Sequence, residues 1–464
     1  MSHTPQSPSS ASPPESSAPT GTTSTRPTLP THSRTAKDVL AELAAMRSRD
    51  ARWHDGRTFS LVYHDTDEHL QLLRDAYTMF LAENALNPMA FPSLRRMETD
   101  VVSMCAGILG GDDEVVGSMT SGGTESLFLA MKTYRDQARK ERPHITAPEV
   151  VLPTTAHPAL IKSAHYLGVK VVLVPPGPDF RADVAAMERA ITPQTLFLVG
   201  SAPAYPHGVV DPITELSDLA LSRSLPLHVD ACVGGFLLPF VRKLGFPVPP
   251  FDFAVPGVTS MSADLHKYGF AAKGASTVMY RTAALRRHQF YVYSGWPGGL
   301  FGSATVLGTR PGGAIAAAWA SLTALGHEGY LRIAGIIMKT TRAFIDGITA
   351  IPDLYVLGQP DCGVFAYASR ELDLMAIADQ MEERGWHIDR QQLPTAIHLT
   401  ITPTHAAIVE RYLGDLRDSV AYVAEHPELS SQGAAAMYGM LMHIPDPSMV
   451  DEFILSNFDS LYRP

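Results

Sequence analysis

The sequence predicts an α/β protein with a mostly parallel central sheet, helices on both faces and a smaller C-terminal α/β domain. The first observation is alternation: from Val115 onward, short β-rich runs alternate with amphipathic helical segments, as in consecutive βαβ units. The second is placement, because several polar or glycine-rich stretches follow expected strands, at the edge where open α/β sheets bind ligands. The third is size, since 464 residues suffice for a large core and two or three structural units.

The chain begins with a segment of distinct composition. Residues 1–35 are dominated by Ser, Thr and Pro and contain almost no bulky apolar side chains. Such a segment cannot bury enough surface to offset its ordering entropy, so we expect a disordered tail. It has neither the apolar core of a secretory signal peptide nor the Arg-rich amphipathic pattern of a transit peptide. A translocation signal of another kind stays an open alternative. An N-terminal helical segment is expected over 36–95, with Thr35 as the N-cap of its first helix.

The helices and strands that follow define two further domains. Helices are expected over 66–83 and from Ser93, and a large domain over 96–335. Its candidate strands are 150–153, 169–174, 196–201, 227–230, 253–255, 260–263 and 277–281, and its candidate helices are 125–140, 159–167, 182–190 and 212–224. A helical pattern over 311–348 predicts a long helix leading to the smaller C-terminal domain, expected over 336–464.

Composition narrows the function classes. A net charge of −10 and a pI near 6 argue against a nucleic-acid surface. No apolar run approaches the ~18 residues of a membrane span. The three cysteines are widely separated and have no metal-ligand spacing, which favours buried free thiols in a reducing, cytoplasmic compartment. Neither H-E-x-x-H nor C-x-x-C occurs, so we expect no metal site.

A glycine-rich stretch, S-M-T-S-G-G-T-E-S over 118–126, precedes a clear helical pattern. Gly123 allows a tight turn, and Thr124 lies in the first helical turn with its free N–H groups. Unsatisfied amides and the helix dipole both favour a phosphate there. A plain glycine turn with Thr124 as N-cap accounts for the stretch equally well.

Two further stretches follow expected strands. His157, in T-T-A-H-P-A over 154–159, can stack on a flat ring or relay protons, although a surface histidine is the simpler interpretation. In G-S-A-P-A-Y-P-H-G over 200–208, Ser201 can donate to a phenolate oxygen. For Tyr205 and His207 an ordinary proline-bound turn is favoured over a place beside substrate.

The stretch from Pro226 to Gly274 carries the strongest chemical signal. Asp230 ends the apolar run P-L-H-V-D, and Lys267 follows His266 in a second run. A buried carboxylate and a buried amine require partners, and Asp230 with Lys267 can be a structural ion pair. Alternatively, they hold a pyridoxal phosphate ring between them, with Asp230 on the protonated pyridine nitrogen and Lys267 as the reactive amine, its pKa lowered by desolvation.

The order of these pieces resembles the fold-type I pyridoxal phosphate enzymes of the group II decarboxylase superfamily. Within it, the chain from about Tyr63 to Tyr462 is similar to the sphingosine-1-phosphate lyases. The matching motifs are F-P-S-L-R-R-M-E, T-S-G-G-T-E-S, G-S-A-P-A-Y-P-H-G, H-V-D-A-C-V-G-G-F, S-A-D-L-H-K-Y-G-F-A-A-K-G-A-S, W-P-G-G-L, G-T-R-P-G-G and A-M-Y-G-M. The second lysine after H-K and the W-P-G-G to R-P-G-G pair distinguish the lyases from the decarboxylases.

The resemblance implies a role for each matching residue. It implies a fold-type I transferase-like fold with pyridoxal 5'-phosphate as cofactor. Lys267 matches the Schiff-base lysine, Asp230 the pyridine partner, His157 the ring-stacking histidine, Gly123 and Thr124 the phosphate loop, and Gly308 and Thr309 a loop contributed by the partner subunit; Tyr63, Asn84 and Lys273 match substrate-handling positions. Ser201 and His266 complete the expected cofactor contacts. The family commonly has a histidine where this chain has Asn87, which puts acid–base details in doubt.

The implied reaction is retro-aldol cleavage of a phosphorylated long-chain sphingoid base to a fatty aldehyde and phosphoethanolamine. Tyr63, His157 and Lys267 are the candidate acid–base groups, and the sequence does not separate them. The implied assembly is a homodimer with active sites at the interface. Two alternatives stay open: an amino-acid decarboxylase with the same cofactor, and a non-catalytic scaffold that kept the fold.

Overall fold

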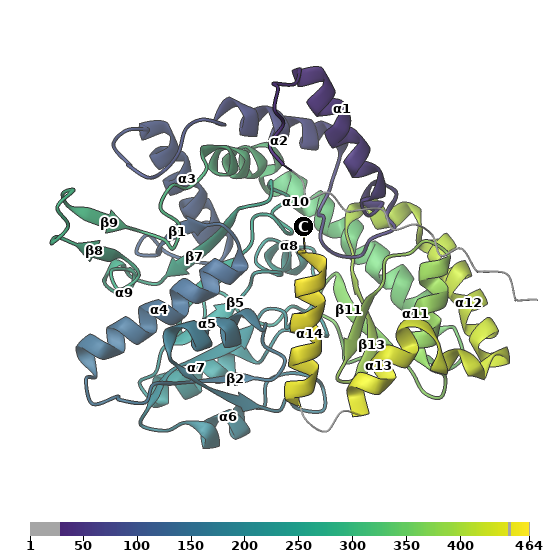
Figure 1. Ribbon diagram of the computed structural model, residues 1–464. Coiled ribbons are helices and arrows are strands. Elements are labelled where there is room, and N and C mark those ends of the chain that lie inside the picture. Colours follow the sequence, from purple (N-terminus) through teal and green to yellow (C-terminus); the bar gives the residue numbers. More distant parts are fainter. Residues whose placement is uncertain (1–27, 444–446, 464) are drawn as a thin grey trace, which may run out of the picture. The chain divides into compact units, whose positions relative to one another are not determined.

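The computed structural model describes residues 28–443 and 447–463 (Figure 1). Contacts divide the chain into two compact units, residues 51–442 and a smaller unit of residues 1–50 and 443–464. The smaller unit contains helices α1 (Ala36–Met46) and α14 (Pro447–Leu461). Thr35 is the N-cap of α1 and accepts a hydrogen bond from the Asp38 amide, as predicted. Most of the expected disordered tail, residues 1–27, lies outside the described residues.

A seven-stranded sheet forms the core of the larger unit. Its order is β1-β7-β6-β5-β4-β2-β3, and β7 alone runs antiparallel to the other six strands. The strands are β1 (Val116–Thr120), β2 (Glu149–Pro153), β3 (Lys170–Val174), β4 (Thr195–Ser201), β5 (Leu227–Asp230), β6 (Val258–Ala263) and β7 (Ser276–Tyr280). The predicted mostly parallel α/β sheet is therefore confirmed.

Helices cover both faces of this sheet. Successive side chains of a strand point to opposite faces, and in β2 Val150 packs in one buried cluster while Val151 belongs to another. The first cluster includes residues of α4 (Gly123–Glu141) and α5 (Ala159–Leu167); the second includes residues of α3 (Pro92–Ile108), α7 (Ile213–Ser222), α8 (Leu238–Lys243) and α10 (Gly312–Thr349). Helix α2 (Asp67–Met79) packs on α10, whereas α6 (Val184–Ala190) contacts β2 and β3 and α9 (Ala283–Arg286) contacts β7 and β1.

The strand expected over 253–255 is wrong. Phe253 and Val255 are buried, as a strand would require. The backbone turns there instead, because the Asp252 carboxylate accepts from the Ala254 amide at 3.2 Å and its carbonyl accepts from Val255 at 2.9 Å. An aspartate that bonds two residues ahead favours a turn over a ladder.

The long helix expected over 311–348 forms as α10 but is interrupted. Gly326 has φ +52° and ψ −172°, which breaks the helical backbone in its middle. Glycine tolerates this conformation because it lacks a Cβ. Among the described residues, no helix is both long and apolar enough to cross a membrane.

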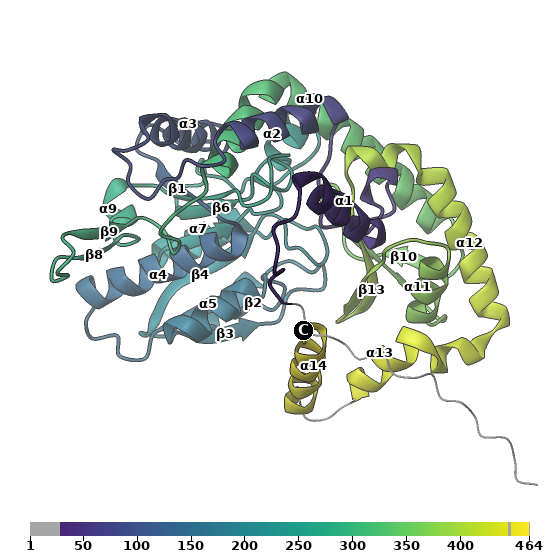
Figure 2. The same ribbon diagram turned by 45° about the horizontal axis from the view of Figure 1, so that its top comes forward.

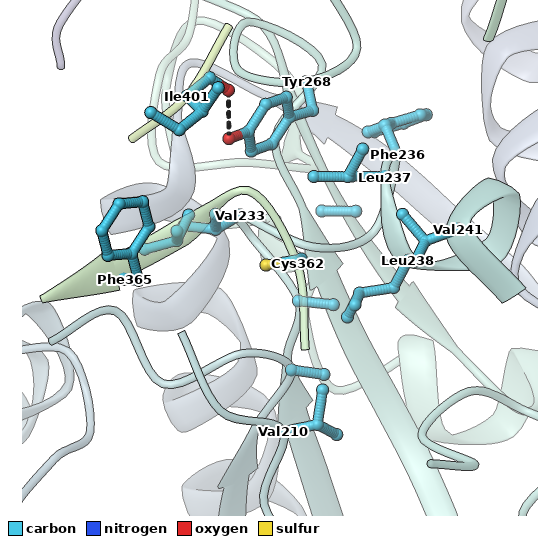
Figure 3. Packing of buried hydrophobic residues seen from close by; sticks show 14 of the residues in the cluster. Val210, Val233, Phe236, Leu237, Leu238, Val241, Tyr268, Cys362, Phe365 and Ile401 are labelled. Carbon is cyan, nitrogen blue, oxygen red and sulfur yellow. Dashed lines mark hydrogen bonds between the residues drawn. The ribbon is translucent and has the colours of Figure 1, made fainter. Parts of the chain in front are cut away.

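A smaller antiparallel sheet follows α10. Its strand order is β10 (Leu354–Val356), β11 (Val364–Ser369), β13 (Thr395–Thr400) and β12 (Asp389–Gln392). The same part of the chain contains helices α11 (Leu374–Glu383), α12 (Val409–Glu425) and α13 (Gly433–His443). Tyr268 links the two sheets, since its hydroxyl donates to the Ile401 carbonyl at 2.8 Å (Figure 3). Phe365 and Cys362 pack near Val233 and Leu238 in the same core. The expected domain boundaries stay predictions.

A two-stranded hairpin projects beyond the main sheet. Strands β8 (Tyr291–Tyr293) and β9 (Phe301–Ser303) pair antiparallel (Figure 2). Val292, Trp296 and Leu300 of this hairpin are exposed apolar residues.

Candidate active site

The parallel strands bring the sequence-predicted polar residues to one edge of the sheet. β4 and β5 are in register so that Ser201 lies beside Asp230, and β5 and β6 place Asp230 beside Ser262. Carboxyl ends of parallel strands form the ligand edge of such sheets. His157 follows β2, and Lys267 follows β6 after a short turn. These side chains therefore lie at one edge of the sheet, and their shared role in one site stays a prediction.

Asp230 is buried and stays ionised. It accepts hydrogen bonds from the Cys232 amide at 3.0 Å and the Ser262 hydroxyl at 3.2 Å. Burial alone would raise the pKa of Asp230, but the His157 ring and the Cys232 groups outweigh it, and the pKa lies below its ordinary value. An ionised buried carboxylate is the partner that a protonated pyridine nitrogen requires.

Lys267 pairs with Asp264, a residue that the sequence reasoning overlooked. Its ammonium lies 2.9 Å from Asp264 Oδ2. Burial by itself would lower the pKa of Lys267, but Asp264 outweighs it, so the pKa lies above its ordinary value. The expectation of a lysine pKa lowered by desolvation is therefore wrong for the chain without cofactor, because the nearby carboxylate favours the charged form.

Two histidines flank the lysine and the carboxylate. His157 Nδ1 accepts from the Ala159 amide at 3.1 Å, so the neutral ring carries its proton on Nε2. His266 Nδ1 accepts from the Ala275 amide at 3.3 Å, and its Nε2 lies 3.6 Å from Asp264. Burial lowers the pKa of both rings. Both histidines are therefore neutral at pH 7.

The glycine-rich stretch forms the start of α4, as predicted. A Cβ added to Gly123 would lie 2.8 Å from Asp264 Oδ2 and 2.9 Å from Cys232 Sγ, so only glycine fits this close approach. Thr124 is exposed in the first turn, beside amides that have no intrahelical partner. These groups form a cradle for an anion.

Glu125 closes this cradle and ties it to a distant loop. One carboxylate oxygen accepts from the Ser121 amide at 2.7 Å, and the other accepts from the amides of Val306 at 2.8 Å and Leu307 at 3.3 Å. The sequence carried a signal for Glu125, because a glutamate at the third helical position commonly bonds back to the helix start.

The residues present fit pyridoxal phosphate. Ser201 Oγ and Asp264 Oδ1 are buried and have no hydrogen-bond partner within the protein, which is unusual for buried polar atoms without a ligand. The cradle at Gly123, the ionised Asp230 and the amine of Lys267 match the phosphate, the pyridine nitrogen and the aldehyde of that cofactor in chemistry.

Tyr63 and Lys273 lie beside Lys267. The Lys273 ammonium is 5.3 Å from the Tyr63 ring centroid and donates to the His266 carbonyl at 3.1 Å. Burial and then repulsion by Lys267 lower the pKa of Lys273 to about 8; the residue keeps solvent access, which screens both effects. Burial raises the pKa of Tyr63 above its ordinary value, so its phenol holds its proton.

Tyr205 and His207 are more buried than their turn sequence suggested. The centroid of the Tyr205 ring lies 4.2 Å from that of the His398 ring. Burial and the nearby Asp389 carboxylate raise the pKa of Tyr205 to about 12, although the charge of Lys267 lowers it. His207 stacks on Phe180 at 4.1 Å. Tyr205 is therefore close enough to Lys267 to interact with it electrostatically.

Asn84, Gly308 and Thr309 form a second group. Asn84 pairs in a β-bridge with Pro311, and the Ala85 amide donates to the Arg310 carbonyl at 2.9 Å. Gly308 and Thr309 are exposed. Gly308 borders a groove of about 910 Å³ that is also lined by Arg310, Glu98 and residues of the β8–β9 hairpin. Asn87 is exposed too, and its carboxamide oxygen accepts from the Met89 amide at 2.9 Å.

The parallel sheet, the Lys267 amine, the Asp230 carboxylate and the anion cradle at Gly123 together define a pyridoxal-phosphate-dependent enzyme. The pyridoxal-dependent decarboxylase conserved domain matches residues 24–369. A sphingosine-1-phosphate lyase from Oryza sativa is 43% identical over 95% of this chain and 83% of its own. The solved sphingosine-1-phosphate lyase of Burkholderia pseudomallei is 38% identical with a TM-score of 0.84, over 91% of this chain and 98% of that one.

A Lactobacillus brevis glutamate decarboxylase has the same fold at 17% identity, with a TM-score of 0.75 over 86% of this chain and 95% of that one. The two sphingosine-1-phosphate lyases are identical to this chain at a much larger share of positions than the glutamate decarboxylase is. The chain belongs to the sphingosine-1-phosphate lyase family. It is a pyridoxal-phosphate-dependent aldehyde-lyase of the decarboxylase superfamily.

Proposed function

We propose that this lyase cleaves phosphorylated long-chain sphingoid bases by a retro-aldol reaction, releasing a fatty aldehyde and phosphoethanolamine. The observation that carries the proposal is a second cation, Lys273, held on the Tyr63 ring beside Lys267. A flexible lysine suits a phosphate group. One phosphate, that of the cofactor, is accounted for by the cradle at Gly123, so Lys273 is left for a phosphate on the substrate.

Bound pyridoxal phosphate supplies an electron sink for the bond that breaks. We assign Lys267 to its aldehyde, Asp230 to its ring nitrogen, His157 to its ring face and Gly123, Thr124 and His266 to its phosphate end. Ser201, with its unpartnered buried hydroxyl, donates to the ring oxygen. This set would hold the cofactor in one orientation.

The pKa directions separate the candidate acid–base groups. His157 is neutral at pH 7, so its ring can accept or relay a proton. Tyr63 keeps its phenolic proton and acts as a donor, not as a free base. Lys267 alternates between the ammonium seen beside Asp264 and a neutral amine. Asn84 and Lys273 orient the substrate's polar end.

We propose that the active enzyme is a homodimer, with Gly308 and Thr309 reaching the partner's cofactor. Their exposure, the adjoining groove of about 910 Å³ and the exposed apolar hairpin support this, since large exposed apolar patches mark interaction sites. Sedimentation measured with activity tests it: a fully active monomer contradicts the proposal. The buried free cysteines favour a reducing, cytoplasmic location.

The decisive experiment is a product assay. Purified protein loaded with pyridoxal phosphate is incubated with dihydrosphingosine-1-phosphate, and the aldehyde and phosphoethanolamine are measured. Release of carbon dioxide from an amino acid, without release of aldehyde, would contradict the proposed lyase reaction and show that the protein is a decarboxylase. The absence of cofactor absorbance in the loaded protein would favour a scaffold.

A further inference from the structure

Asp264 lies between the two parts of the proposed cofactor site. Its side chain is 1% exposed, and its Oδ2 is 2.9 Å from the Lys267 ammonium. A Cβ on Gly123 would come within 2.8 and 3.0 Å of its two oxygens. One carboxylate therefore contacts the reactive lysine and lies directly beneath the first turn of α4.

The backbone holds Asp264 and Lys267 on the same side of a turn. The Lys267 amide donates to the Asp264 carbonyl at 3.2 Å, and the Asp264 amide donates to the Cys232 carbonyl at 3.2 Å. A hydrogen bond between residues three apart closes a tight turn. The turn therefore keeps the backbones of Asp264 and Lys267 close together, so that the two side chains can meet.

The two oxygens of Asp264 differ in their surroundings. Oδ2 has Lys267 as its partner, whereas Oδ1 is buried and has no hydrogen-bond partner within the protein. A buried acceptor without a partner costs about 1–3 kcal/mol, and Oδ1 of Asp264 is one such atom. Asp264 keeps this acceptor free, close to where Lys267 has to change its protonation state.

We propose that Asp264 holds Lys267 in place and takes the proton from its ammonium when the amine has to react. The proton moves from Nζ to Oδ2, which leaves a neutral amine and a neutral carboxylic acid. When the amine is released again it recovers the same proton, so the pair is unchanged over one turnover. Asp264 is thus a positioning residue and a proton store that acts through Lys267. This rests on the proposed role of Lys267.

The charged and titratable groups around Asp264 agree with this role. The groups that interact with it are Lys267, His266, Lys273, Cys232, His157 and Tyr63. Among them Lys267 is the nearest cation. The histidines are neutral, and burial together with negative neighbours raises the pKa of Cys232 and keeps its thiol protonated. Lys267 is therefore the group that exchanges a proton with Asp264.

The test uses the cofactor-free protein, so its result does not depend on activity. Lysines are acetylated at a series of pH values, and the modification of Lys267 is followed by mass spectrometry, with the exposed Lys140 as internal reference. In the wild type we expect Lys267 to react with an apparent pKa above that of Lys140. Asp264→Asn is expected to lower it by about one unit or more, which makes modification at neutral pH about tenfold faster.

Asp252→Asn is the matched control, because Asp252 is also a buried carboxylate, paired with Arg242 at 3.0 Å; it should leave Lys267 unchanged. A Lys267 that titrates like Lys140 in the wild type overturns the proposal and needs no folded variant. Equal titration in wild type and Asp264→Asn overturns it as well. Asp264→Glu, which keeps the charge, should restore part of the shift. The product assay is separate, so failure of the lyase reaction and failure of this proposal are distinguishable.

Discussion

The surroundings of Lys267 and the loop that contains Gly308 differ in how much of a site each one contains. Around Lys267, the ends of β4, β5 and β6 supply buried groups with defined partners, and the chain alone builds a cradle for the cofactor. Gly308 and Thr309 are exposed, and Gly308 borders a groove. The groups around Lys267 thus have their partners within one chain, whereas the exposed Gly308 loop is the part for which we propose a role in a second copy.

Removal of the reactive amine should have the largest effect. We expect Lys267→Ala to lower aldehyde release about 1,000-fold or more, because the covalent attachment of the cofactor is lost. The cofactor's visible absorbance should disappear in the same sample. A variant that keeps both would show that the region around Lys267 is not the chemical centre.

Filling the space at Gly308 tests the other region. The nearest atom to a Cβ there is Leu86 Cδ1 at 3.8 Å, so Gly308→Val should fold normally within one chain. If the loop serves the partner, activity should fall about 100-fold, since small misplacements near the chemistry have effects of that size.

Mixed dimers provide the decisive control for Gly308. Lys267→Ala and Gly308→Val subunits, each nearly inactive alone, should regain about a quarter of the activity when combined at equal amounts. This follows because half of the dimers are mixed and one of their two sites has neither change. Absence of complementation would show that the loop acts within its own chain.

Lys273 should affect substrate binding more than turnover. We expect Lys273→Ala to raise KM for the phosphorylated base about 10- to 100-fold, with a smaller change in kcat. In the wild type, burial lowers the pKa of Lys273 to about 8, and phosphate binding needs the charged form. KM should therefore rise as pH increases above about 8, and this rise should vanish in Lys273→Ala.

Glu125 connects the two regions, and its loss should have the smallest effect. Glu125→Ala removes an acceptor from three amides, which we expect to cost about 1–3 kcal/mol of stability. Hydrogen exchange at Val306 and Leu307 should quicken, and affinity for pyridoxal phosphate should weaken. Glu125→Gln should recover part of both, since its one oxygen can still accept at one end. Unchanged exchange would show that the bridge does not hold the loop.

The sequence predicted the fold class well because it depends on local patterns, and the roles of the inner-site residues stay predictions. Short apolar runs and helical periodicity predict the alternation of strands and helices in a βαβ protein, and polar residues such as Asp230 at the ends of parallel strands lie at one edge of the sheet. The strand expected over 253–255 failed because a side-chain bond of Asp252 to the Ala254 amide outweighed β propensity.

Asp264 was overlooked for a different reason. Which of Asp230 and Asp264 pairs with Lys267 depends on the direction of the turn after β6, and residue spacing does not encode that direction. The bridge from Glu125 to Val306 spans 181 positions in the chain. Such long-range contacts have no local signature.

The hydrogen bond from Tyr268 to Ile401 bears on when this contact can form during synthesis of the chain. The residue next to the reactive lysine is anchored to a carbonyl 133 positions further along the chain. During synthesis the segment carrying Lys267 is complete well before that anchor exists, and long-range contacts form late. The segment that contains Lys267 therefore gains this contact only after the residues of the C-terminal sheet have been synthesised.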